Sequence, residues 1–583
     1  MKRNKVAIAA AAALACCASG LVAPTESASA SSAIFTSIDE THPITLGAPM
    51  NPYNTKGNSF DSYDQMELGY NQYNGAHPDA MFPALAATWK TVRGGLDVYL
   101  QAKADWSDGE PVTSSDVKTS VANSFIVGTQ ASNLAGVTVL GPKEIRFNEE
   151  PGTHNSLFAA QVLETIIVPN SEYGALLPSD IWSVISASEG KGGAAQKAKA
   201  TLTKLAPTVE DYAPKTDISA GPFYIARLNA GEALLVKNKY FFDASKISPE
   251  EVVLRNYTGN EEIWNYMEAG QLDFAPYTSM PSNVLHDVLR AGNKELVAPS
   301  FVAVALAFDE ARYPYGIAAV RKALAYLLNR PAITKVGEPV SGAPAKWQTG
   351  LIDSVSAQWL PSSELSKFNR YNYDPAKATS LLKAVGFTER SGQWHMPNGK
   401  AWKITLATPS GFSDWDAAAV YMSHELSAFG IPTSVSTAPD YATYLTNIAN
   451  GDYATAFWLN ALGPAVYNAY ARVWGNNVTS KGNELTTKGS FLHTPATFKT
   501  DGYGTVALNT LTEGLEDKTT AQARPVVAKL AAAYNQELPM ITIWDYVLVE
   551  FVTDKHFTDW PSSPGLLNNP PGLWMWNGYV HAK

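Results

Sequence analysis

The chain has 583 residues, of which 45% are hydrophobic and 17% charged, and its formal net charge is −10 at pH 7. This length exceeds what one hydrophobic core supports, and the composition is typical of a folded protein rather than a disordered one. Because the charge is negative and lysine and arginine form no run, nucleic acid and anionic membrane surfaces are poor partners.

The N-terminus has the pattern of an export signal. Lys2, Arg3 and Lys5 precede an apolar run over residues 6–15, which is too short to span a bilayer. We therefore expect residues 1–16 to be a signal peptide and the body of the protein to lie outside the cytoplasm.

Two processing sites at the end of this signal peptide are possible. The sequence Leu14-Ala15-Cys16-Cys17 resembles a bacterial lipobox, whereas Ala28-Ser29-Ala30 fits ordinary signal-peptidase cleavage. We favour a lipid at Cys17, with residues 17–33 as a flexible tether on the extracellular face of the membrane. Cleavage after Ala30 would instead give a secreted or periplasmic protein. The chain has only these two cysteines, so its body holds no disulfide.

A turn and a helix start follow closely on one another at residues 104–121. Asp108-Gly109 is a turn dipeptide, and Thr113 is placed to cap a helix whose third residue is Asp116. These residue types also occur in catalytic sites. We interpret the segment as a structural joint in which Trp106 is packed.

Helical and strand-like patterns then alternate to the end of the chain, which indicates α/β domains. Helical periodicity covers residues 316–329, 375–385 and 415–429, and strand-like runs cover 252–254, 302–308, 402–407 and 540–549. Residues 191–200, which are small and polar, predict an exposed insertion.

Five segments, in order, carry a family resemblance: Trp106–Val117, Gly221–Phe242, Met267–Phe274, Ala319–Arg330 and Tyr371–Phe387. Together they resemble the family-5 extracellular solute-binding proteins of bacterial ABC importers. The second segment is a looser match, because Phe223 stands where the family has tyrosine and its ending is shorter.

The resemblance implies an α/β, two-lobed periplasmic-binding-protein-like fold (type II, cluster C) with an extra subdomain in lobe one. A small-molecule ligand would lie between the lobes and pass to ABC permease subunits, and the receptor would be a monomer. The implied limits are 34–76, 205–300 and 540–583 for lobe one, 77–204 for the subdomain and 301–539 for lobe two.

Catalytic and metal-binding patterns are missing from the sequence. His424-Glu425 begins like a zinc-protease motif, but Ala428 stands where the second histidine belongs. The nine histidines are scattered without ligand spacing, and no metal or other cofactor is indicated. We therefore predict a binding protein and not an enzyme, with a glycosidase carboxylate pair as the remaining enzymatic alternative.

The segment Gly451–Trp474 bears on the ligand. Peptide-binding members of the family place an aspartate shortly after a strand that ends in tryptophan, whereas Trp458 is followed by Asn460 and by no acid before Trp474. A buried ligand ammonium without a counter-charge would be costly. The segment is similar to oligosaccharide-binding members, so we expect an oligosaccharide. An oligopeptide is the alternative, with the acid supplied from elsewhere, for instance by Asp414 or Asp416.

The predicted ligand-binding residues are aromatic or amide side chains, which stack on sugar rings or bond to hydroxyls. They are Asn51, Tyr53, Tyr277, Trp415, Trp458, Asn460, Tyr467, Trp474 and Trp544. Packing in the core is the competing interpretation for each of them.

Overall fold

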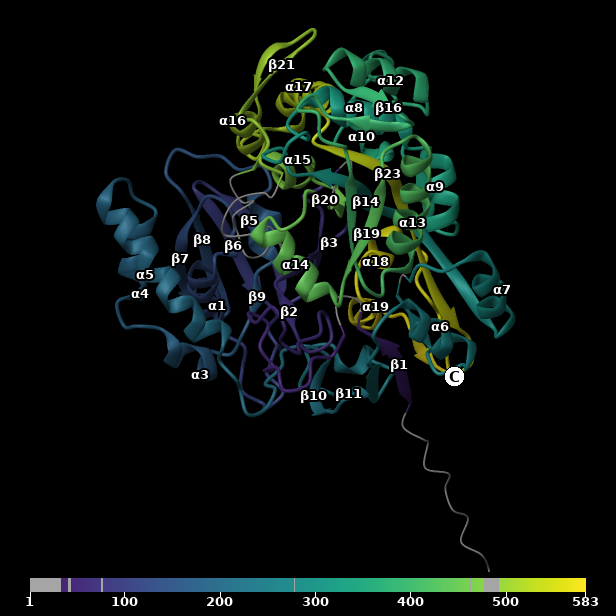
Figure 1. Ribbon diagram of the computed structural model, residues 1–583. Helices are drawn as coiled ribbons and strands as arrows, with labels where there is room; N and C mark the ends of the chain where they lie inside the picture. The colour runs from purple at the N-terminus through teal and green to yellow at the C-terminus, as the bar shows by residue number, and fades with distance from the viewer. Residues whose placement is uncertain (1–32, 40–42, 75–76, 277, 461–462, 476–491) are drawn as a thin grey trace, which may run out of the picture. The chain divides into compact units, whose positions relative to one another are not determined.

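The computed structural model describes residues 33–39, 43–74, 77–276, 278–460, 463–475 and 492–583 (Figure 1). Their buried hydrophobic side chains form two large clusters. One draws on residues 35–298 and 552–580 and is here called the core of lobe one. The other draws on residues 301–544 and is the core of lobe two. The domain limits given above stay a prediction.

Lobe one is built around a four-stranded sheet. Its order is β1 (Ile34–Ile38), β12 (Glu251–Arg255), β11 (Glu232–Lys237) and β10 (Phe223–Leu228). Buried and partly exposed residues alternate along β11 and β12, as expected of strands with one face on a core. The predicted strand at 252–254 and the hairpin after Gly221 are confirmed.

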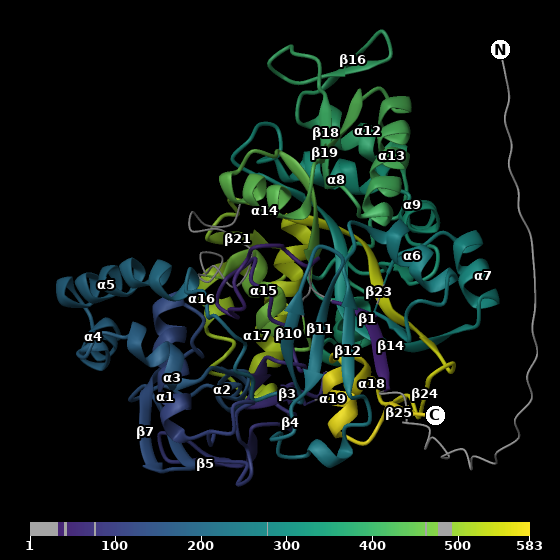
Figure 2. The same cartoon turned by 90° about the horizontal axis from the view of Figure 1, so that it is seen from below.

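A second four-stranded sheet of lobe one lies beside a group of helices (Figure 2). Its strands are β5 (Ala86–Val92), β6 (Gly95–Leu100), β8 (Glu144–Glu149) and β7 (Leu134–Gly141), and the helices include α1 (Ser114–Val127), α4 (Ile181–Ser188) and α5 (Gly193–Glu210). Residues 193–200 form the start of α5. The predicted exposed insertion is therefore helical. Most of its residues are exposed, but Ala195 and Ala198 lie on one face of the helix and are buried, which holds the helix against the rest of the protein.

A mixed sheet forms the centre of lobe two and extends into lobe one. The order is β13 (Phe274–Ala275), β23 (Met540–Thr553), β14 (Asn293–Phe308), β20 (Thr455–Asn460), β18 (Ile404–Pro409) and β19 (Thr433–Ala438), with β15 (Gly342–Pro344) on β23. Helices α8 (Ala318–Leu327), α9 (Arg330–Gly337), α12 (Pro375–Ala384) and α13 (Ser413–Ala428) confirm the helical predictions and add α9.

Two long strands connect the lobes. The first part of β14, to Pro299, pairs with β23 residues 547–553, and the part from Ala303 pairs with 540–545. The register shifts between Pro299 and Ala303, so the ladder is interrupted where the chain leaves one core for the other. Figure 1 shows β14 and β23 running side by side over this length.

The joint at residues 106–116 is formed as predicted. Thr113 caps α1 in a reciprocal capping box with Asp116, and Gly109 adopts φ +92° in the preceding turn. The Trp106 side chain is buried in the core of lobe one. Asp116 accepts from Thr113 within the cap and also from the Asn170 backbone N–H at 2.8 Å, so its carboxylate is fully used in holding the fold.

Candidate functional site

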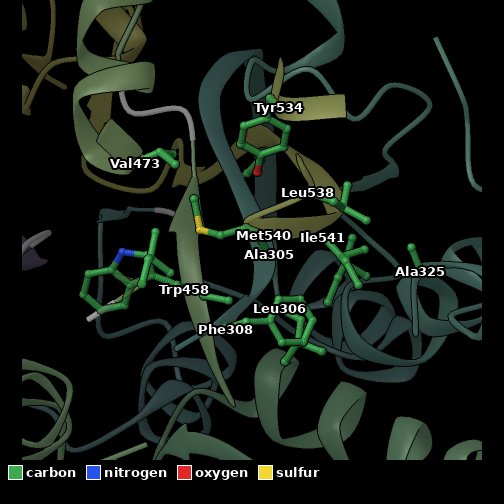
Figure 3. Close-up of a cluster of buried hydrophobic side chains, with 14 of the residues drawn as sticks. Ala305, Leu306, Phe308, Ala325, Trp458, Val473, Tyr534, Leu538, Met540 and Ile541 are labelled. Carbon is green, nitrogen blue, oxygen red and sulfur yellow. The ribbon is translucent and has the colours of Figure 1, made fainter. Parts of the chain in front are cut away.

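Three predicted ligand residues gather inside lobe two, around Tyr534. Trp458 is buried, and the guanidinium carbon of Arg472 lies over its ring, 4.6 Å from the ring centroid. Trp474 stacks on Tyr470 with centroids 5.8 Å apart and meets Tyr534 edge-on at 6.0 Å. Figure 3 places Trp458 and Tyr534 in one hydrophobic cluster. These contacts are those of a packed core.

Asn460, the third of these residues, ends β20 and is fully buried. Its Nδ2 donates to Tyr534 Oη at 3.3 Å and to Thr542 Oγ1 at 3.1 Å, whereas its Oδ1 has no partner among the described residues. The indole N–H groups of Trp474 and Trp544 likewise lack partners there. Unpaired buried polar atoms are costly, so these three are where water or a polar ligand would bond.

Trp415 and Trp544 both contact one tyrosine, Tyr546. The Trp415 indole N–H donates to Tyr546 Oη at 3.1 Å, and the rings of Trp544 and Tyr546 are perpendicular at 6.0 Å. The predicted Tyr467 is buried on α15 (Val466–Trp474). Apart from Tyr467, the lobe-two predictions thus form two groups, one around Tyr534 and one around Tyr546.

The predicted residues of lobe one do not join these groups. Asn51 is fully buried, and its Nδ2 donates to the carbonyl oxygens of Val209 and Tyr212 at 2.8 and 3.0 Å. Tyr53 donates to the Ser120 carbonyl oxygen at 3.4 Å. Both residues therefore tie their loop to α1 and α5. Tyr277 lies outside the described residues.

A buried acidic group adjoins Tyr546. Tyr546 Oη donates to Asp414 Oδ2 at 2.5 Å, at the start of α13. Burial, followed by the negative charge of Glu338, raises the pKa of Asp414 to about 7. The sequence pointed to Asp414 as an alternative acid. Tyr546 and Glu338 are far from it in the chain and carry no local signal.

The two lobes touch beside this group. The Nδ2 of Asn260, at the start of α6 (Asn260–Glu268) in lobe one, donates to Ser413 Oγ of lobe two at 2.9 Å. The backbones approach so closely that a Cβ on Gly259 would lie 3.2 Å from the Gly411 Cα. We call Gly259–Asn260 and Gly411–Ser413 the interlobe contact. It lies where β12 and β18 end and their following helices begin, the usual position of ligand-facing loops.

Acidic side chains lie on both sides of the interlobe contact. Glu261 stands in the first turn of α6 and Asp416 in the first turn of α13. Burial and the charge of Glu261 raise the pKa of Asp416, although a hydrogen bond from Thr408 opposes the shift. The positive ends of the two helices stabilise these carboxylates. The charged groups that shift the pKa values of Asp414 and Asp416 are thus themselves acidic.

Two kinds of feature are absent from the described residues. No group of three or more histidine, cysteine, aspartate or glutamate side chains within them is arranged to hold a metal ion. No helix in the described part of the chain has the length and apolar character needed to cross a membrane.

Similar proteins of known sequence share only part of the chain. The glutathione-binding protein GsiB of Salmonella paratyphi A is 27% identical over 176 residues, which are 30% of this chain and 32% of that protein. GsiB of Escherichia coli K12 is 24% identical over 222 residues, 38% of this chain and 39% of its own length. The chain thus matches about a third of the length of these curated relatives.

Solved structures match nearly the whole chain. A mannohexaose-bound periplasmic oligopeptide-binding protein of an ABC transporter from Thermotoga maritima aligns with a TM-score of 0.72 at 19% identity, over 95% of this chain and 99% of that one. The oligopeptide-binding protein AppA of Bacillus subtilis, in complex with a nonapeptide, gives 0.70 at 15% identity, over 94% and 99%. These matches confirm the predicted two-lobed α/β fold.

The family model described as bacterial extracellular solute-binding proteins, family 5 middle, matches residues 80–483, well over half of the chain. The five sequence segments named above, the two-lobed fold and this match agree with one another. The chain belongs to the family-5 bacterial extracellular solute-binding proteins.

Proposed function

We propose that this protein is the extracellular receptor of an ABC importer, which encloses one small molecule between its lobes and delivers it to the permease. Family membership and the two lobes joined by β14 and β23 support this role. A ligand that contacts both lobes favours their closed arrangement by its differential affinity, and no catalytic step is needed.

The ligand is a short oligopeptide or a similar molecule with a free amino group. The observation that carries this assignment is the acidity of the interlobe contact, where Asp414 is buried beside Glu338, and Asp416 faces Glu261. Of these pairs, Glu261 and Asp416 lie on different lobes, so closure brings their like charges together and raises the free energy of the closed arrangement. A ligand ammonium between the lobes lowers it. Asp414 or Asp416 thereby supplies the acid that is missing after Trp458.

A neutral oligosaccharide is the second candidate. The unpartnered Asn460 Oδ1 and Trp474 indole N–H favour it, because sugar hydroxyls donate and accept hydrogen bonds. In this case Trp458 and Trp474 would supply stacking faces, as predicted from the sequence. The Thermotoga relative carries a mannohexaose, whereas the Bacillus relative carries a nonapeptide, so neither candidate is preferred on similarity.

Thermal-shift measurements separate the candidates. The purified chain is heated with short peptides, with the same peptides N-acetylated, and with manno-, cello- and malto-oligosaccharides. A ligand at 100 times its Kd adds about 2.7 kcal/mol to the unfolding free energy. Stabilisation by free but not acetylated peptides supports the first candidate, and stabilisation by a sugar alone replaces it with the second. If nothing in either library stabilises the chain, both assignments are wrong.

The lipid anchor at Cys17 stays a prediction, because Cys17 lies outside the described residues. The Cys17→Ala chain should leave the membrane fraction for the medium. A membrane-free wild-type chain beginning at Ser31 would instead show cleavage after Ala30.

A further inference from the structure

A second contact joins the lobes, between the start of α2 (Phe158–Leu163) in lobe one and the turn that precedes α17 (Thr520–Glu537) in lobe two. The Ser156 backbone N–H donates to the Glu516 carbonyl oxygen at 2.9 Å. The Ser156 hydroxyl lies 3.1 Å from that oxygen and donates to the Lys518 carbonyl oxygen at 2.9 Å. One serine thus bonds to two peptide carbonyls of the other lobe, those of Glu516 and Lys518.

A side-chain bond completes this contact. Gln161 Nε2 donates to Glu516 Oε1 at 2.6 Å, and Gln161 Oε1 accepts from Asn155 Nδ2 at 2.8 Å. Because both ends of the Gln161 amide are bonded, its orientation toward Glu516 is fixed. Glu516 is only 5% exposed, so its bond to Gln161 is shielded from water.

Each half of the contact is anchored in its own lobe. Phe158 and Leu163 are buried in the core of lobe one, whereas Leu515, next to Glu516, is buried in the core of lobe two. Because their donors and acceptors belong to different lobes, these hydrogen bonds must break when the lobes separate.

We propose that Ser156 and Gln161 of lobe one and Glu516–Lys518 of lobe two form a latch that stabilises the closed arrangement without help from the ligand. The latch lies on segments other than those of the interlobe contact at Gly259 and Gly411. It goes beyond the proposed function, because it acts in the empty receptor. Its effect on transport would be to slow ligand release.

The environment of Glu516 makes the latch sensitive to pH. Burial is the largest cause that raises the pKa of Glu516, hydrogen bonds from Gln161 and Ser132 oppose it, and the charges of Glu513 and Asp517 add to it, so that the pKa reaches about 7. A carboxyl exposed to water by opening would titrate near its ordinary pKa of about 4.3. Closure therefore takes up a proton, so the latch is strongest at acidic pH and weakens as the pH rises through 7.

Spin-label distances in the unliganded chain test the latch. The only cysteines are Cys16 and Cys17, so after their replacement by serine, labels can be placed at Lys197→Cys on α5 and Thr505→Cys on lobe two, both exposed positions. At pH 5, where the latch is strongest, we expect Gln161→Ala and Glu516→Ala each to lower the ratio of short-distance to long-distance populations by about tenfold, the effect of losing one buried hydrogen bond. The matched control is Gln196→Ala, an exposed glutamine of α5 that should change nothing.

Gln161→Glu provides a second measurement should the alanine variants not fold. It places two carboxyls against each other, so the short-distance population should persist at pH 5 and be lost at pH 8, a larger fall than the one that Glu516 alone causes in the Gln196→Ala control. Unaltered distance distributions in the folded alanine variants, or a Gln161→Glu chain that stays closed at pH 8, would overturn the latch. Neither result would touch the proposed function, because no ligand is present.

Discussion

The joint at Thr113 and the interlobe contact at Asn260 both place carboxyl groups at the start of a helix, but they differ in how their polar groups are satisfied. At the joint, Asp116 bonds to the backbone and side chain of Thr113, three residues away. At the interlobe contact, Asp414 bonds to Tyr546, 132 residues away, and lies near the acid Glu338. Local pairing stabilises a fold, whereas buried like charges raise the free energy unless a ligand or a proton relieves them.

The core of lobe two should show the largest effect of a single substitution. Trp458→Ala removes a fully buried ring from beneath Arg472, and we expect the unfolding free energy to fall by about 3–5 kcal/mol, the range for such truncations. Urea unfolding measures it. A folded variant of unchanged stability that has lost ligand affinity would place Trp458 in the ligand site instead.

The buried acid should make stability depend on pH. The folded-state pKa of Asp414, about 7, lies above its unfolded value of about 3.9, so its stabilising effect is present at low pH and is lost as the pH rises through 7. The slope would reach about 1.4 kcal/mol per pH unit at its steepest. Unfolding followed from pH 4 to 8 should show a steeper slope in the wild type than in Asp414→Asn, which keeps other buried acids such as Glu516; equal slopes would contradict the assignment.

The closeness of the lobes can be tested by adding one methyl group. Gly259 has φ 178°, which alanine adopts without strain, but a Cβ there meets the Gly411 Cα of the other lobe at 3.2 Å. Gly259→Ala should therefore weaken binding of the ligand found by thermal shift by about tenfold, roughly 1.4 kcal/mol, and leave the melting temperature of the empty chain unchanged. Gly193→Ala, at the start of α5, where the added Cβ meets nothing and the backbone does not require glycine, is the matched control. Full affinity in Gly259→Ala would mean that the lobes do not close at this point.

The joint should respond in the opposite way. Asp116→Ala removes half of the capping box, so we expect a loss of about 1 kcal/mol in unfolding free energy and no change in ligand affinity. Melting and titration of the same preparation measure both. An affinity loss at unchanged melting temperature would show that the joint is part of a site.

The difference between the regions also explains what could be predicted from the sequence. The cap at Thr113 and helices such as α12 follow from residues a few positions apart, and the ordered segments indicated the family. The four predicted tryptophans and Tyr467 are buried, but their surroundings depend on strands distant in the chain, such as β20 and β23, and their ligand contacts stay a prediction. The bond from Asn260 to Ser413 and that from Tyr546 to Asp414 join residues more than 130 positions apart. No local pattern marks such pairs.

The most direct test of the central claim, that an acidic interlobe contact receives a ligand amine, is calorimetric titration of one peptide from the screen, free and N-acetylated, into the wild type and Asp414→Asn. The account predicts that the free peptide binds the wild type, that acetylation weakens this binding by at least about tenfold, and that Asp414→Asn removes the difference between the two peptides. Equal binding of free and acetylated peptides by the wild type, or a difference that survives in Asp414→Asn, would contradict it.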